Sequence, residues 1–545
     1  MKRLVLRNFE DVRGRHCSAF HPIWYNAFEK GFGIRQFRKG SAMKEYTIAD
    51  FLNKNAAKDD VSFHMPGHKG RSALYEESGY GALLKNAAAW DITEIPGADS
   101  LFCPRGALRN VMDNYAELYG ARHTELLVNG SSAGLIAAII SSVPVGGKLI
   151  LGRNSHHAAF SALRLGGINP VYIRPETDPD FNIAAEISPY ELEAACEANP
   201  DASAVLITSP NYCGQLSDIA VLSDVAHDHG MLLIVDQAHG AHLKFFDYDA
   251  ETAREDGAYI PHMRHAAESL GADIVVNSTH KTLLSFTGSG ILNICGDSVD
   301  IDAVSEALRM VQTTSPSYLL MASLDINEKI MRKKWREIVA AWKEDLRGFY
   351  KGASKINGLT IVTGGGARGS GAQDEEVFAL YRYREGPDPT KINISMSELG
   401  LSGERLDKEL RYRGIISEMV HGEYVLLMTG AGNVRHDYER LLEALQDISS
   451  SYGVGTHIDR TPRSFDDIVL DYADVPVDGV YVPLYEAVGR VLYDPIITYP
   501  PGTPIACPGE ILSMEVISHI SDILEDGETI TGVDEEGMIK VGTGY

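Results

Sequence analysis

The sequence lacks the long apolar runs of a membrane protein, since none of its stretches approaches the ~20 apolar residues that cross a bilayer. Its start also lacks the apolar segment of a secretory signal. The six cysteines form no CxxC pair and no disulfide-like spacing, which predicts a reducing compartment, with the cytoplasm as the default. Lys and Arg number 50 against 75 Asp and Glu, a formal net charge of -25. Nucleic acid and anionic membrane are therefore not expected partners, whereas a small cationic substrate is compatible with this charge.

At 545 residues, the chain is long enough for several packed domains. Changes in composition and periodicity divide it into four predicted parts. These are a basic N-terminal extension (1–42), an N-terminal arm with a large domain (43–325), a small α/β domain (326–448) and a C-terminal domain (449–545). The extension is interpreted as disordered or as the product of a mis-assigned start, and a targeting or docking arm is the alternative.

Short apolar runs alternate with helical periodicity from Thr124 onward, which is typical of an α/β fold with a mostly parallel sheet. The predicted strands cover residues 124–130, 148–154, 203–210, 231–237 and 272–278. Ligands of such sheets bind beyond the carboxyl ends of the strands. The polar residues that follow these strands, at 129–132, 154–157, 236–239 and 278–281, are therefore expected to converge on one crevice.

Lys281 ends the sequence Ser-Thr-His-Lys, directly after the last of these strands. A lysine there can form a Schiff base if its surroundings keep part of its amine neutral. Asp236 ends an earlier strand, where its carboxylate could pair with a protonated pyridine nitrogen. The turn Gly130 to Gly134 opens an apolar helix and offers hydroxyls and backbone N–H groups to a phosphate. Together these features favour a pyridoxal 5'-phosphate (PLP) site.

The order and wording of these passages resemble the Orn/Lys/Arg decarboxylase family, whose members are PLP enzymes of fold-type I. The resemblance covers most of residues 60–545. The matching passages are SFHMPGHKGR (62–71), DITEIPGADSL (91–101), VNGSSAG (128–134), RNSHHA (153–158), DQAHGAH (236–242), NSTHKTL (277–283), QTTSPSYLLMASLD (312–325) and YPPGTPIACPGE (499–510). The resemblance implies an aspartate-aminotransferase-like large domain with smaller α+β C-terminal domains, and the decarboxylation of a basic amino acid.

Carried over position by position, the resemblance gives roles to the residues around the ring of the cofactor. Lys281 would bind PLP as a Schiff base, Asp236 would pair with the pyridine nitrogen, and His156 would stack on the ring face. Ala238 would pack beneath the ring. His239 would lie near the phenolic oxygen or the substrate carboxylate. No metal is expected.

The resemblance also implies a phosphate site that two subunits share. Its residues in one chain would be Gly130, Ser131, Ser132, Ser278 and His280. The segment Thr313, Thr314 and Ser315 would reach the phosphate of a neighbouring subunit, so the expected assembly is a homodimer with shared active sites or a higher oligomer built from it.

A long cationic substrate needs a carboxylate at the far end of its pocket, and the candidates are Glu94, Glu418 and Glu510. Arginine, giving agmatine, is the first choice of substrate, because compact members of the family often use it; lysine and ornithine follow. The chain has FCPRG at 102–106 where many relatives read His-His-Pro-Glu-Gly, which puts substrate identity in doubt. Since the shared passages begin near residue 60, neither the N-terminal response-regulator-like domain of the large members nor their decamers are expected.

Other functions compete for the same residues. Gly130 to Gly134 also fits G-x-S-x-G, so a serine hydrolase could use Ser132 with Asp236 and His280. The spacing of Asp236, His239 and His242 could chelate a metal, but with no matching Cys/His cluster elsewhere ordinary hydrogen-bonding histidines are the favoured interpretation. A catalytically silent binding protein is a third class. Within PLP chemistry, an aminotransferase or an aldolase is the nearest alternative.

Overall fold

The computed structural model describes residues 48–176, 183–252, 264–362, 387–452, 471–499, 504–525 and 529–543. By internal contacts, the chain divides into Met1–Asp59 and Asp60–Tyr545. The described part of the first unit holds helix α2 (Ile48–Ala56), and the second holds every other element given below. The predicted extension, 1–42, and the Gly-rich stretch, 364–376, lie outside the described residues. The four-part division of the chain stays a prediction.

A seven-stranded sheet forms the centre of the second unit, with the strand order β2-β8-β7-β6-β5-β3-β4. Its strands are β2 (His123–Leu127), β3 (Lys148–Gly152), β4 (Asn169–Ile173), β5 (Ala202–Thr208), β6 (Leu232–Asp236), β7 (Ile274–Asn277) and β8 (Gly290–Ile294). Strand β8 runs antiparallel to both of its neighbours, and the other pairings are parallel. All five predicted strands are confirmed. The predictions missed β4, whose residues at the sheet edge are mostly half-buried, and β8, which begins with glycine.

Apolar side chains alternate between the two faces of this sheet. Leu149 and Leu151 of β3 pack with one set of helices, whereas Ile150 between them packs with the other set. The first set is α7 (Gly130–Ser142), α8 (His157–Gly166) and α13 (Ile301–Val311), and the second is α9 (Pro189–Ala198) and α10 (Ile219–Asp228). Because both faces are covered, the strands are apolar almost throughout, as parallel strands in α/β folds are.

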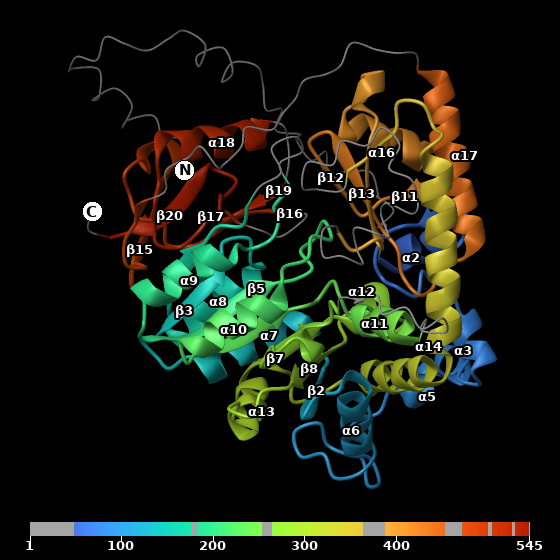
Figure 1. The fold of residues 1–545 in the computed structure, drawn as a ribbon, viewed down its shortest axis with the longest axis horizontal. Coiled ribbons are helices and arrows are strands. Elements are labelled where there is room, and N and C mark those ends of the chain that lie inside the picture. Colours follow the sequence, from blue (N-terminus) through green and yellow to red (C-terminus); the bar gives the residue numbers. More distant parts are fainter. Residues whose placement is uncertain are drawn as a thin grey trace, which may run out of the picture. The chain divides into compact units, whose positions relative to one another are not determined.

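A single helix, α14 (Tyr318–Ala353), runs for 36 residues and joins the large sheet to a smaller one. It begins where the Ser317 hydroxyl accepts a hydrogen bond from the N–H of Leu320, so it crosses the predicted boundary at residue 325 without a break. The smaller sheet has the order β12-β13-β10-β9 and is antiparallel. Its strands are β9 (Thr360–Ile361), β10 (Lys391–Ser395), β12 (Met419–His421) and β13 (Tyr424–Met428). Helix α16 (Gly403–Tyr412) packs on this sheet, and α17 (Arg435–Ser451) lies alongside α14 (Figure 1).

The early residues of the second unit form short elements that pack beside β11 and α14. Strand β1 (Val61–Ser62) pairs in parallel with β11 (Ile415–Ile416), so the start of this unit lies beside the smaller sheet. The remaining helices are α3 (Ala73–Glu77), α4 (Ala82–Lys85), α5 (Ala87–Trp90), α6 (Ala107–Tyr119), α11 (Leu243–Thr252) and α12 (Thr279–Thr282), with 3-10 turns η1 (Ala267–Ser269) and η2 (Ser397–Leu399).

The C-terminal residues have a hydrophobic core of their own, which includes Leu492, Ile520 and Val541. Its elements are β14 (Asp471–Tyr472) paired with β18 (Glu510–Ile511), β15 (Gly479–Pro483) paired with β20 (Met538–Gly542), the sheet β17 (Pro504–Ala506), β16 (Ile496–Tyr499) and β19 (Thr529–Thr531), the turn η4 (Leu484–Glu486) and helix α18 (Met514–Glu525). Strands β16 and β18 lie at the two ends of the Pro-rich passage 499–510, and α18 follows it.

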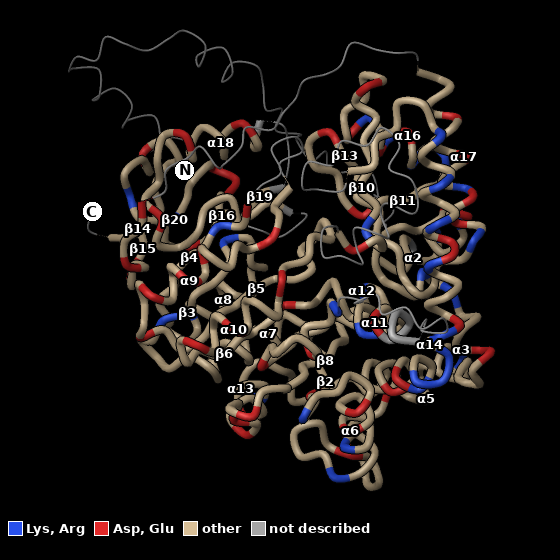
Figure 2. Tube along the Cα trace, viewed as in Figure 1, with Lys and Arg blue, Asp and Glu red and all other residues tan. Residues whose placement is uncertain are grey.

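Charges of both signs are interspersed along α14 and α17 (Figure 2). On α14 they form pairs one turn apart, Lys329 with Asp325 and Arg332 with Glu328. Pairs at this spacing stabilise the helix. Among the described helices, none is both long and apolar enough to cross a bilayer. The five described cysteines are all free thiols.

Candidate active site

A cavity of about 410 Å³ lies at the carboxyl ends of the large sheet. Residues at or just after the ends of β2, β3, β5, β6 and β7 line it, among them Ser131, His156, Thr208, Asp236 and Lys281. The four predicted polar segments therefore converge on one crevice, as expected for an open parallel sheet. The smaller sheet supplies the opposite wall through Met419, His421 and Tyr424. The volume suits a cofactor with a small substrate.

Lys281 lies on α12, the single helical turn that follows β7. Its Nζ is 2.8 Å from Nε2 of His239. Burial lowers the pKa of Lys281 to about 8, against the opposing effect of the Asp236 charge. Near pH 7.5, roughly a quarter of such an amine is neutral, whereas an unperturbed lysine is almost wholly protonated. The site therefore provides the nucleophilic amine that a Schiff base requires.

Distant parts of the chain hold the turn that carries Lys281. The N–H of Gly67 donates to the His280 carbonyl at 2.8 Å, and the N–H of Ala431 donates to the Thr282 carbonyl at 2.8 Å. A Cβ atom at position 67 would lie 2.3 Å from the Leu283 carbonyl oxygen, so only glycine allows this close approach. Both carbonyls that flank Lys281 are thus fixed by residues outside the large sheet.

Asp236 is the last residue of β6 and is 6% exposed. Burial raises its pKa, and the positive charge of Lys281 opposes that rise. Among the described residues, the one hydrogen bond to its carboxylate comes from the N–H of Ala238, at 3.1 Å. A buried carboxylate with so few donors has capacity for a cationic N–H partner. Ala238 lines the same cavity.

Three histidines of the cavity are held neutral. Burial lowers the pKa of His156 to about 3, that of His280 to about 4, and that of His239 well below its usual value. His280 Nδ1 lies 2.7 Å from the Ser289 carbonyl, which can only accept, so Nδ1 carries the proton of the neutral ring. The ring of His239 lies against that of Tyr212, with centroids 4.6 Å apart.

The turn after β2 has the features of an anion site. Gly130 has φ +75, a conformation that favours glycine, and it opens the 13-residue helix α7 toward the cavity. Ser131 and Ser132 line the cavity, and Ser278 donates its hydroxyl proton to Ser131 Oγ at 2.6 Å. Helix dipole, backbone N–H groups and hydroxyls therefore meet at one point, where a phosphate is favoured.

Unpaired polar atoms indicate that the cavity takes a polar ligand. Among the described residues, Asn154 Oδ1, Thr208 Oγ1 and His239 Nδ1 are buried without a hydrogen-bond partner, and all three residues line the cavity. Buried polar atoms are normally paired, so a ligand with donors and acceptors fits here. A ring with a phosphate, a phenolic oxygen and a protonated nitrogen matches the hydroxyls and backbone N–H groups of the turn after β2 and the carboxylate of Asp236.

Thr313 and Thr314 do not line this cavity and are exposed. The N–H of Thr313 donates to Asn129 Oδ1 at 3.1 Å, next to the anion-binding turn. Their predicted contact with a neighbouring subunit stays a prediction.

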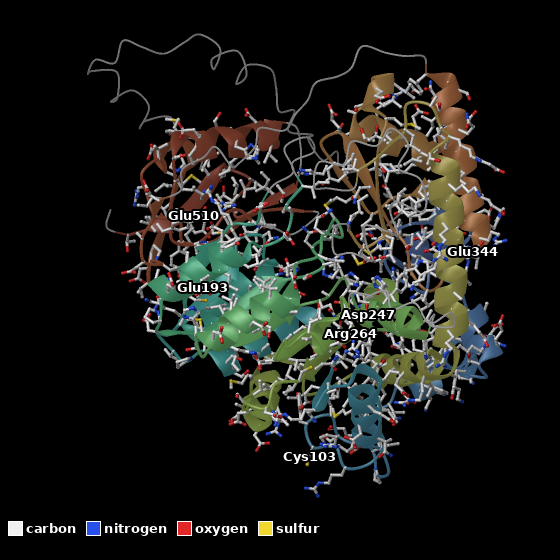
Figure 3. All side chains as sticks on the ribbon, in the orientation of Figure 1. Cys103, Glu193, Asp247, Arg264, Glu344 and Glu510 are labelled. Atoms are coloured by element: carbon white, nitrogen blue, oxygen red, sulfur yellow. The ribbon has the colours of Figure 1, made fainter. Side chains whose placement is uncertain are left out.

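None of the three candidate glutamates lines the cavity. Glu94 is exposed. Glu418 is buried and accepts from the Tyr212 hydroxyl at 2.6 Å and from the Met65 N–H at 2.9 Å. Glu510 is buried against Arg153 at 2.7 Å, at the edge of the C-terminal core (Figure 3). Structural partners therefore already engage the carboxylates of Glu418 and Glu510.

The segment FCPRG, 102–106, lies apart from this site. Phe102, Cys103 and Arg105 line a separate cavity of about 230 Å³, with Arg109 and Arg309, and Cys103 is on the loop before α6 (Figure 3). None of residues 102–106 therefore lines the Lys281 cavity of the same chain.

Neither rival constellation assembles among the described residues. His280 directs Nδ1 to a backbone carbonyl and not to Asp236, so the Ser132 triad lacks its central hydrogen bond. His242 contacts Asp388 at 3.1 Å instead of joining Asp236 and His239 around a metal.

The model of the major domain of Orn/Lys/Arg decarboxylases matches residues 48–437. The chain belongs to this family. It is 32% identical over 500 residues to the arginine decarboxylase of Bacillus subtilis (strain 168), an alignment that covers 90% of this chain and 96% of that protein. As an Orn/Lys/Arg decarboxylase, it is a PLP-dependent decarboxylase whose cofactor fits the cavity described above.

Solved structures show the same fold at low sequence identity. Lysine decarboxylase A from Pseudomonas aeruginosa superposes with a TM-score of 0.67 at 20% identity, covering 91% of this chain and 80% of that one. An SPT structure with PLP superposes with a TM-score of 0.50 at 16% identity, covering 72% and 87%. The predicted fold-type I architecture with a mostly parallel sheet is confirmed.

Thr208 and Tyr212 were not predicted as site residues, although Thr208 lies in a predicted strand and Tyr212 follows that strand. Applying the strand-end rule to that strand would have found both. Met419, His421 and Tyr424 carry no local signal, because only the packing of the smaller sheet brings them to the cavity.

Proposed function

We propose that this decarboxylase converts arginine to agmatine and CO2, with lysine and ornithine as the next candidates. The observation that carries the proposal is the position of the Lys281 amine, 2.8 Å from His239 in a cavity that also holds Asp236. Similarity to the Bacillus subtilis arginine decarboxylase favours arginine among the basic amino acids.

The residues that hold PLP follow from the cavity. Lys281 would hold it covalently and Asp236 would keep the pyridine nitrogen protonated. His156 and Ala238 would contact its ring. Gly130, Ser131, Ser132, Ser278 and His280 would hold the phosphate. When bound, PLP withdraws the electron pair of the bond between Cα and the carboxylate, so that CO2 leaves.

His239 and Lys281 supply the proton that replaces CO2 at Cα. Loss of CO2 leaves an electron pair at Cα, which takes up one proton to give the amine product. The contact between Lys281 Nζ and His239 Nε2 keeps a proton donor within reach of that carbon. Leu135, Ile183 and Met419 give the cavity apolar surface, against which a carboxylate is less solvated and leaves more readily.

Recognition of the cationic end of the substrate involves more residues than those that line the cavity of one chain. The described lining holds one carboxylate, Asp236, while Tyr212 and Tyr424 offer aromatic faces to a guanidinium. Glu94 is exposed and does not line the cavity of its own chain, so a role in substrate binding would require the cavity of a neighbouring chain. This agrees with the homodimer with shared sites that the Thr313 to Ser315 segment predicts. The cytoplasmic location stays a prediction from the sequence.

A panel of arginine, lysine and ornithine, each assayed with added PLP for CO2 and for the amine, tests the proposal. Stoichiometric CO2 and agmatine from arginine, with slower turnover of the other two, is the expected result. A keto acid or an aldehyde without CO2 would indicate an aminotransferase or an aldolase and overturn it.

A further inference from the structure

A fully buried cluster of charged residues lies behind His239. Lys391, at the start of β10, and Asp388 are both 0% exposed, and Lys391 Nζ is 2.9 Å from Asp388 Oδ2. His242 Nε2, also from a buried side chain, lies 3.1 Å from the same oxygen. The cluster joins the smaller sheet to the segment that follows β6, and the reaction described above does not use it.

The ammonium of Lys391 has all three donors satisfied. They go to Asp388, to Thr390 Oγ1 at 3.1 Å, and to the backbone carbonyl of His239 at 2.9 Å. Packing alone does not account for a buried ion pair, since apolar residues often replace one without loss of stability. Of these three hydrogen bonds, only the one to the His239 carbonyl connects the ammonium to a residue that lines the active-site cavity.

The same cluster fixes the loop that carries Tyr212. The N–H of Asp388 donates to the Gly214 carbonyl at 2.8 Å. Gly214 has φ +94, and a Cβ atom there would lie 2.8 Å from Lys391 Cβ, so the loop packs directly on the lysine. Tyr212, two residues earlier, holds its ring against His239. Lys391 and Asp388 thus hold His239 by its backbone and the loop that covers its ring.

We propose that Lys391, held by Asp388 and His242, is a positioning residue that fixes His239 so that its Nε2 stays within reach of the Lys281 amine. The inference rests on the role given above to His239 and adds residues of the smaller sheet to the reaction. Lys391 lies behind the cavity lining and acts through the His239 carbonyl.

The charge of Lys391 also reaches the active site. Burial is the main cause of the lowered pKa of Lys281 and of His239, and the positive charge of Lys391 adds to both effects. Asp236 and Glu418 act on Lys281 in the opposite direction. Removing the Lys391 charge alone should therefore raise the pKa of the Lys281 nitrogen.

Two variants separate positioning from charge. Lys391→Met removes the hydrogen bond and the positive charge, whereas Lys391→Met with Asp388→Asn removes the hydrogen bond with no change in net charge. Lys343→Met is the matched control, because Lys343 is also buried and donates to a backbone carbonyl, that of Phe246 at 3.1 Å, and does not line the cavity. Each holoenzyme is assayed for kcat and KM, and the visible absorbance of PLP on Lys281 is titrated with pH in the absence of substrate.

Both Lys391 variants are expected to lose about ten- to a hundredfold in kcat, since small misplacements of a catalytic group have effects of that size, while KM changes little. The absorbance pKa rises in the single variant and stays near the wild-type value in the double variant. Lys343→Met changes neither property. The double variant leaves no unpaired buried charge, so it serves if the single variant does not fold.

The proposal is overturned if folded Lys391 variants keep the kcat and the absorbance titration of Lys343→Met. A wild-type holoenzyme that releases no CO2 from any basic amino acid refutes the proposed function instead. In that event the absorbance titrations of Lys391→Met and Lys343→Met still decide whether Lys391 acts on the Lys281 site.

Discussion

Replacing Glu510 with Gln should loosen the C-terminal core rather than act first on substrate. The Glu510 carboxylate is 1% exposed and accepts two hydrogen bonds from Arg153, at 2.7 and 3.1 Å, and one from the Cys507 N–H at 2.9 Å. Removing one partner of a buried ion pair costs about 3–5 kcal/mol. The low end applies, because the amide oxygen of Gln can still accept one of these bonds.

A loss of about 3 kcal/mol corresponds to a roughly 150-fold larger population of the opened C-terminal core. Native-state proteolysis measures this, since cleavage tracks that population when opening and closing are fast. Cleavage sites within 504–525, identified by mass spectrometry, report on the core itself. Asp494→Asn is the control, because its ion pair with Arg164 is exposed and worth at most about 1 kcal/mol.

Equal cleavage rates for Glu510→Gln and Asp494→Asn would refute this reasoning. So would a Glu510→Gln enzyme with unchanged cleavage and a raised KM for arginine, which would return Glu510 to the substrate role that the sequence suggested. The structure favours the first effect because Arg153 already occupies the carboxylate.

Further expected results concern the cofactor. Borohydride reduction of the holoenzyme should abolish its visible absorbance and leave the reduced adduct on Lys281, and a peptide map that places it on another lysine would contradict the site. PLP capture by the cofactor-free chain should speed up as pH rises through about 8, where the neutral form of Lys281 becomes the main one, and a rate independent of pH would contradict this. Asp236→Asn should bind PLP but lose most turnover, at about 1.4 kcal/mol for each pKa unit lost at the ring nitrogen, and near-normal kcat would remove Asp236 from the mechanism. Thr314→Ala should weaken PLP retention by roughly 1.5 to 3 kcal/mol, and mixing it with Lys281→Ala should restore activity if two chains share a site. No restored activity between chains shown to exchange would argue against sharing.

The sequence predicted the part of the site that strand ends determine. Polar residues after apolar strands mark Asp236, His156 and Lys281 because chain direction alone sends the ends of parallel strands to one edge. Packing decides the rest. His421 and Tyr424 reach the cavity from a sheet whose position depends on α14, and no local pattern encodes that contact.

The candidate glutamates show that a sequence motif does not determine what a carboxylate binds. A carboxylate in a family passage is equally compatible with binding substrate and with anchoring structure, and only its partners separate the two. Glu418 is engaged by Tyr212, and Glu510 by Arg153. Both contacts span more than 200 residues of sequence, a separation that periodicity cannot report.

The two hydrogen bonds that fix the turn carrying Lys281 determine when this turn can be completed during synthesis of the chain. Gly67, one of the two donors, is translated early. Ala431, the other donor, is translated only when about four-fifths of the chain has been made. A nascent chain of 400 residues already contains every predicted PLP-binding residue, yet the carbonyl of Thr282 still lacks its donor. Full cofactor competence therefore comes late in synthesis, and chains released before residue 431 should appear as protein without the bound chromophore.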